Sequence, residues 1–101
     1  MNDPRLYQLV KTNRALFWSV GDDNLDKLNN ESIVEGFLNF GDEQNVKTLF
    51  EILGTEKVAR IFYEHVNRPR HNYYRQPAHY FNLYFRRHAP QAYSDAQLKI
   101  N

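Results

Sequence analysis

The sequence contains no cysteine among its 101 residues, and this absence removes several classes of protein. Without cysteine, neither a disulfide framework nor a thiolate-ligated zinc site can form. Long apolar runs are absent as well, since none approaches the roughly 20 residues that cross a bilayer. Polar and charged residues follow Met1 directly, where a signal peptide would need an apolar segment. We therefore expect a cytoplasmic protein without a membrane span.

The residue patterns of the common catalytic sites are also missing. The four glycines form no phosphate-binding loop, and neither an HExxH zinc motif nor a paired-carboxylate motif occurs. Ser19, Ser32 and Ser94 have no nucleophile signature around them. The four histidines lack the i, i+4 spacing of a helical metal clamp. The sequence therefore predicts a protein that is not an enzyme and has neither a cofactor nor a metal site.

The charges that are present are segregated along the chain, although the net charge is only +1. Residues 22–56 carry nine acidic and two basic side chains, whereas residues 57–88 carry seven basic and one acidic. Two interpretations follow from this pattern. Either the halves fold against each other and partly neutralise, or they form opposed faces for different partners.

Apolar residues recur at helical spacing in three consecutive segments: 30–40, 42–53 and 55–66. Gly41 and Gly54 are suitable stops for the first two helices, and Asp42 and Thr55 are suitable N-caps for the next two. A short helix is expected within residues 4–14. Residues 15–20 are expected to be extended or turn-like.

After Val66 the helical pattern stops for eleven residues, 67–77. Pro77 suits the first position of a last helix, because its missing N–H costs nothing there. A chain of this length is expected to form one domain that buries about two-thirds of its unfolded surface. The sequence predicts a single all-α domain over residues 1–101, a compact cluster of four to five short helices with a long basic loop before the last one.

The stretch from residue 68 to residue 88 has an unusual composition, with five arginines, three histidines, six Phe or Tyr residues and no acidic residue. Arginine and tyrosine are enriched where proteins bind partners. We predict that Trp18 and seven residues of the stretch form a partner-binding surface. The seven are Arg68, Arg70, Tyr73, Tyr74, Arg75, Arg86 and Arg87. The alternative is that Tyr73 and Tyr74 fold back on the helices while the arginines pair with Asp22, Asp23 and Asp26.

Two nucleic-acid functions are alternatives to protein binding. Arginines interleaved with tyrosines can neutralise phosphates and stack unpaired bases, which favours RNA or single strands over duplex readout. Arg60 and His65 are spaced as Arg-x4-His, which resembles the signature of the HEPN superfamily of small all-helical ribonucleases. In that signature a polar residue usually follows the arginine, whereas Ile61 follows it here. The nuclease is therefore the weaker alternative.

A family resemblance begins at Leu16, Phe17 and Trp18, which small and acidic residues follow. With the later segments NFGD, VKTLFEILGTEKVARIF and HYFNLYF, residues 15–88 resemble a family of small uncharacterised bacterial proteins that open on Leu-Phe-Trp-Asp. Ser19 stands where that family commonly has the aspartate, and Asp22 and Asp23 come later. The resemblance implies an antitoxin-like protein whose partner is a nucleotidyltransferase-like toxin of an abortive-infection system. It implies no catalytic residue.

The combined prediction is a non-enzymatic interaction module, antitoxin-like, that binds a partner protein through a basic aromatic surface. An RNA- or DNA-binding regulator is the alternative, and a homodimer is left open. Trp18 is either a core residue or an anchor inserted into the partner. The core interpretation is favoured, because short helices need large side chains to close one end of a bundle.

Overall fold

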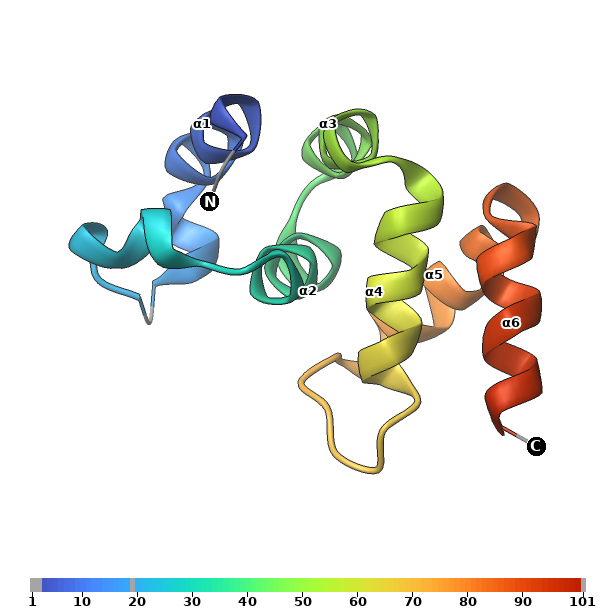
Figure 1. Cartoon of the computed structure of the whole chain (residues 1–101). Coiled ribbons are helices and arrows are strands. Elements are labelled where there is room, and N and C mark those ends of the chain that lie inside the picture. Colours follow the sequence, from blue (N-terminus) through green and yellow to red (C-terminus); the bar gives the residue numbers. More distant parts are fainter. Residues whose placement is uncertain (1–2, 19, 101) are drawn as a thin grey trace.

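The computed structural model describes residues 3–18 and 20–100, without the side chains of Asp22, Asp23, Lys99 and Ile100. This part of the chain folds into six α-helices and two 3-10 helices, and it contains no strand (Figure 1). The elements in chain order are α1 (Pro4–Thr12), η1 (Arg14–Phe17), η2 (Asp22–Lys27), α2 (Asn30–Phe40), α3 (Glu43–Leu53), α4 (Thr55–Val66), α5 (Arg75–His88) and α6 (Pro90–Ile100). The predicted all-α class is confirmed.

The predicted number of helices is wrong, because α6 follows α5 and packs against both α4 and α5. Its buried face consists of Ala92 and Ala96, one helical turn apart. Pro90 is its first residue, a position where proline costs no hydrogen bond. Alanine side chains give little hydrophobic contrast, so the helical period is hard to see in this segment.

The helix boundaries agree with the sequence prediction at some positions and differ at others. Asp42 caps α3, since its carboxylate accepts a hydrogen bond from the Asn45 N–H at 2.8 Å. Thr55 is instead the first residue of α4, and Gly54 before it has a φ of 90°, which favours glycine. Pro77 is the third residue of α5 rather than the first.

The core is rich in aromatic rings supplied mainly by α2 to α5. Phe37, Phe62 and Phe85 are completely buried. Phe85 packs against Phe62 with ring centroids 5.4 Å apart and against Phe50 at 5.8 Å. These contacts join α3, α4 and α5 into one unit. The loop of residues 67–74 projects beneath α4 (Figure 1).

The arginines of the stretch 68–88 do not pair with the acidic residues of the segment 22–56 among the described side chains. Within the described part of the chain, none of these five arginines forms an ion pair. Instead, Arg60 of α4 pairs with Asp95 of α6 at 2.9 Å. The pairing of these arginines with Asp22 and Asp23, which belongs to the alternative interpretation, lies outside the described side chains.

Every helix in the described ranges, 3–18 and 20–100, is too short or too polar to cross a lipid bilayer.

Candidate functional site: an aromatic pocket beside the basic loop

Trp18 and the loop of residues 67–74 meet at an open pocket of about 460 Å³ beside the last turns of α2. We call it the aromatic pocket. It is lined by eight residues: Trp18, Glu35, Asn39, Phe40, His71, Asn72, Tyr73 and Tyr74. The structure thus brings Trp18 to the same pocket as Tyr73 and Tyr74, two other predicted partner-binding residues that follow it by more than fifty positions in the sequence.

Trp18 is 83% exposed, so the favoured interpretation of Trp18 as a core residue is wrong. The preceding residue, Phe17, is the buried one, and its ring packs edge-on against Phe37 with centroids 5.6 Å apart. Gly36 makes room for that ring, since a Cβ at this position would lie 2.5 Å from Phe17. Phe17 therefore fixes the short segment that presents Trp18 to solvent.

We expect Gly36→Ala to destabilise the protein, although alanine is the better helix former by about 1 kcal/mol. The added methyl group overlaps the ring of Phe17, and overpacking of this kind typically costs about 1–3 kcal/mol. Chemical denaturation measures the change. Gly21→Ala is the matched control, because nothing lies within 4 Å of the corresponding Cβ. A more stable Gly36→Ala variant would show that Phe17 does not occupy this space.

Asn39 holds the loop against α2. Its side-chain amide donates a hydrogen bond to the carbonyl of Asn72 at 3.0 Å. Its Oδ1 accepts a hydrogen bond from the backbone N–H of Tyr74 at 3.1 Å. The ring of Tyr74 then packs edge-to-face on Phe40, with centroids 5.4 Å apart. Both rings stay about half exposed, so the contact fixes them at the surface without burying them.

Tyr73 lies in the core and not on the surface predicted for it. It is 5% exposed and packs edge-to-face against Phe62, with centroids 5.0 Å apart. Its backbone N–H donates to Nδ1 of His71 at 3.2 Å, and its hydroxyl has no hydrogen-bond partner among the described residues. Burial, together with the nearby charge of Glu35, raises the pKa of the Tyr73 hydroxyl well above its ordinary value. Tyr73 anchors the loop and forms the floor of the pocket.

We expect the protein to lose stability as the pH rises above about 10, the ordinary pKa of tyrosine. Burial raises the pKa of Tyr63 to about 12 and that of Tyr73 further. The unfolded chain therefore ionises first, releases protons that the folded chain retains, and is favoured at alkaline pH. Tyrosinate absorbance checks this, because Tyr63→Phe should remove a step near pH 12. A titration complete near the ordinary pKa for all tyrosines would contradict the burial of Tyr63 and Tyr73.

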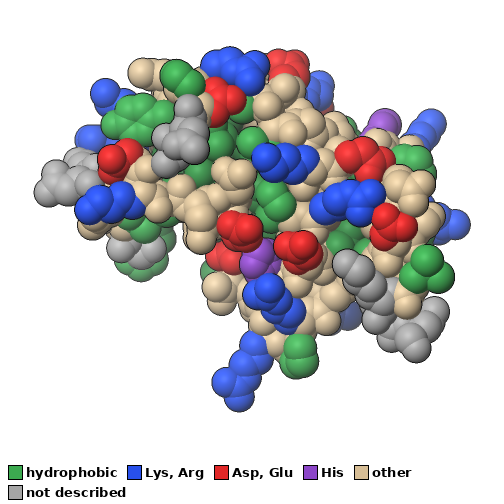
Figure 2. Space-filling view, viewed as in Figure 1, with side chains coloured by type: hydrophobic (Ala, Val, Ile, Leu, Met, Phe, Trp, Pro, Cys, Tyr) green, Lys and Arg blue, Asp and Glu red, His purple; other side chains and the backbone are tan. Residues whose placement is uncertain are grey.

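The predicted arginines fall into two groups near the two ends of α5. Arg68 and Arg70 lie in the loop and Arg75 begins α5, whereas Arg86 and Arg87 lie in its last turn. A rise of 1.5 Å per residue places Arg86 roughly 16 Å along the helix from Arg75. Basic side chains project beyond the lower edge of the molecule in Figure 2, where Figure 1 shows the loop.

The two arginines at the end of α5 have a structural explanation. The carboxyl end of a helix carries partial negative charge, which favours basic residues in the last turn. Arg86 and Arg87 occupy that turn, and the guanidinium of Arg86 lies 6.0 Å from the ring centroid of Tyr93. We therefore do not count them with the aromatic pocket.

The sequence analysis missed Glu35, Asn39 and Phe40 as site residues. Phe40 follows Phe37 by three positions, which is the spacing of a core residue. Asn39 is 33 positions from the loop residue that it binds, and no local pattern predicts such a contact. Only the tertiary fold brings these side chains to the loop.

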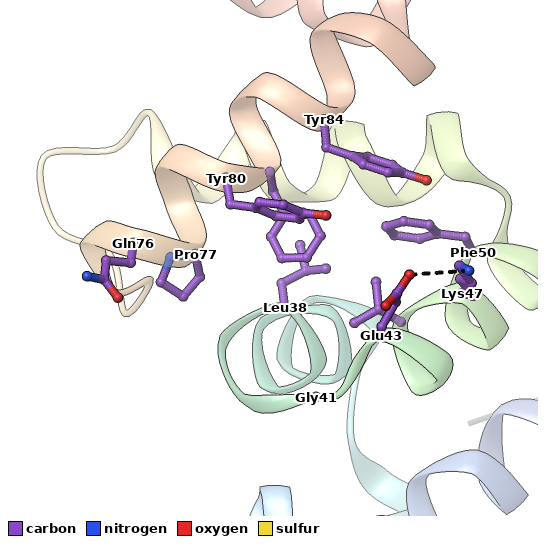
Figure 3. A pocket seen from close by; sticks show the side chains of 11 residues that line it. Leu38, Gly41, Glu43, Lys47, Phe50, Gln76, Pro77, Tyr80 and Tyr84 are labelled. Atoms are coloured by element: carbon purple, nitrogen blue, oxygen red, sulfur yellow. Dashed lines mark ion pairs between the residues drawn. The ribbon is translucent and has the colours of Figure 1, made fainter.

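A second concave surface lies among α3, α5 and the end of α2 (Figure 3). This groove has a volume of about 440 Å³ and is largely apolar. Tyr80 and Tyr84 stack along it with centroids 6.3 Å apart, and Phe50 faces Tyr84 at 5.4 Å. Glu43 and Lys47 form an ion pair at 3.3 Å on its rim. None of the residues predicted for partner binding lines it.

The Arg-x4-His pair of the nuclease alternative is engaged in structural contacts. Arg60 donates to the Asp95 carboxylate at 2.9 Å. His65 has Nδ1 3.1 Å from the carbonyl of Ile61 in its own helix. In addition, the described residues contain no group of three or more acidic or histidine side chains placed to hold a metal ion.

Comparison with protein-family models, curated proteins and solved structures finds no match to this chain. The resemblance to the Leu-Phe-Trp-Asp family, and the antitoxin-like role that it implies, therefore stay predictions.

Proposed function

We propose that this protein is a non-enzymatic interaction module that binds a partner protein through the aromatic pocket and the adjoining basic loop. The observation that carries the proposal is the exposure of Trp18 beside Phe40 and Tyr74. Exposed aromatic clusters are uncommon on proteins without partners, and Trp and Tyr dominate the energy of many interfaces.

The rings are also held in place before any partner arrives. Asn39 fixes the loop backbone on both sides of Tyr73, and Phe17 fixes the segment that carries Trp18. Preorganisation of this kind reduces the entropy that is lost on binding. The pocket is therefore suited to receive a side chain from a partner without rearrangement.

The arginines around the pocket favour a partner surface with acidic residues. Arg68, Arg70 and Arg75 are exposed and form no ion pair within the described part of the chain. Complementary charges at the rim of an interface accelerate association and select among partners. The partner implied by the family resemblance, a nucleotidyltransferase-like toxin, remains part of this proposal.

Nucleic-acid binding is the weaker proposal on the same surface. Burial of Tyr73 leaves Tyr74 as the loop tyrosine on which an unpaired base could stack. Binding of RNA by the arginines alone would depend mainly on phosphate charge and would fall steeply with salt.

The proposal is tested by purifying the tagged full-length protein from its native host, treating the sample with nucleases, and identifying bound proteins by mass spectrometry. We expect one protein to be recovered with the wild type and lost with Trp18→Ala. Leu98→Ala is the matched control, because Leu98 is a large apolar residue of α6 that is 76% exposed and does not line the pocket.

Each other outcome counts against the proposal. Recovery that disappears after nuclease treatment would favour the nucleic-acid function. Recovery of a second copy of the chain alone would show that the surface forms a homodimer. Equal loss of the partner in Trp18→Ala and Leu98→Ala would show that the aromatic pocket is not the binding site.

A further inference from the structure

The lining of the aromatic pocket combines exposed aromatic rings with a single carboxylate. Trp18, Phe40 and Tyr74 present ring surface to solvent, and Glu35 supplies the negative charge. No lysine or arginine lies among the lining residues, although the loop that carries Arg68 and Arg70 supplies part of the lining, including His71. The lining of the pocket therefore contains a carboxylate and no lysine or arginine, whereas the loop beside it is rich in arginine.

Neither Glu35 nor Trp18 has a hydrogen-bond or ion-pair partner among the described residues, although the charge of Glu35 acts on the buried hydroxyl of Tyr73. Within the described ranges, the Glu35 carboxylate forms no hydrogen bond or ion pair. Trp18 makes no ring contact with a described aromatic side chain, whereas Phe40 and Tyr74 contact each other. A carboxylate and an indole ring without such a partner thus line the same small pocket.

We propose that the aromatic pocket binds the guanidinium group of an arginine side chain from the partner protein. Aromatic faces carry negative partial charge and attract cations that lie over them. A guanidinium is planar, stacks on such a face, and can donate two parallel hydrogen bonds to one carboxylate. This inference rests on the proposed function and names the chemical group that the partner inserts.

Other occupants fit the lining less well. An apolar side chain would cover Glu35 without pairing it, and removing an unpaired charge from water is costly. An acidic side chain would be repelled by the same carboxylate. A lysine ammonium could pair with Glu35, but it lacks the planar surface that stacks on Trp18.

A titration with capped peptides tests this assignment without the partner. The isotope-labelled full-length protein is titrated with Gly-Gly-Arg-Gly-Gly, and the indole N–H signal of Trp18 is followed by NMR. The sequence contains one tryptophan, so this signal needs no assignment. The same peptide with citrulline, which has the shape of arginine but no charge, is the matched probe. Both titrations are run at the same pH.

We expect the arginine peptide to shift the indole signal and to bind about tenfold more tightly than the citrulline peptide. Glu35→Gln should reduce arginine binding to the citrulline level. Glu51→Gln should leave it unchanged, because Glu51 is an exposed residue of α3 outside the pocket. Unchanged thermal stability of Glu35→Gln is the control for folding.

Equal binding of the two peptides, binding of neither, or full arginine binding by Glu35→Gln would overturn the assignment. These outcomes differ from failure of the proposed function. If the peptides fail but Trp18→Ala still loses the partner protein, the pocket receives a different side chain. If Trp18→Ala retains the partner, the partner binds elsewhere on the protein.

Discussion

Phe85→Ala is expected to lower the free energy of unfolding by about 3–5 kcal/mol, the upper range for truncation of a buried side chain. Phe85 is completely buried at the junction of three helices. Its ring lies 5.4 Å from Phe62, 5.8 Å from Phe50 and 6.1 Å from Tyr63, measured between centroids. Truncation leaves a cavity that these rings cannot close without moving. Urea denaturation followed by circular dichroism measures the change.

Leu83→Ala in the same helix is the matched control, because Leu83 is an exposed residue of α5. We expect its effect to stay below about 1 kcal/mol, as for most surface substitutions. Equal effects of the two substitutions would contradict the packing of α5 against α3 and α4.

Trp18→Ala is expected to have the largest effect on binding and almost none on folding. An interface anchor commonly contributes 2 kcal/mol or more, so the affinity for the partner should fall by about thirtyfold or more. The free energy of unfolding should change by less than about 0.5 kcal/mol, because Trp18 is 83% exposed. Calorimetric titration with the recovered partner and thermal unfolding measure the two quantities.

The opposite result would be loss of several kcal/mol of stability in Trp18→Ala. That result would mean that the indole is packed inside the protein and would restore the core interpretation. Tyr74→Ala provides a second variant at the same pocket, since Tyr74 is 59% exposed and also belongs to the lining.

The sequence predicts the central part of the fold well because the relevant signals are local. The apolar spacing over residues 30–66 and the N-cap at Asp42 depend on residues within one or two turns. The helices α2, α3 and α4 occupy these segments. By contrast, α6 was missed because its buried face consists of alanine, whose short side chain gives no clear apolar period.

The candidate site shows a different limit of sequence analysis. Phe17 and Trp18 are adjacent aromatic residues, and so are Tyr73 and Tyr74, yet in each pair one ring is buried and the other exposed. The direction of each ring depends on contacts that are distant in the sequence. Gly36 accepts the ring of Phe17, and Phe62 packs against Tyr73. Neither contact could be found from the composition of the stretch alone.

The most direct test of the central claim is fluorine NMR of the protein labelled with fluorotryptophan, recorded alone and with the unlabelled partner. One resonance is expected, because the chain has a single tryptophan. The account predicts a solvent-exposed signal in the free protein that shifts and becomes protected from solvent when the partner binds. A signal already protected in the free protein, or one that the partner leaves unchanged, would contradict the role of Trp18 as an exposed anchor.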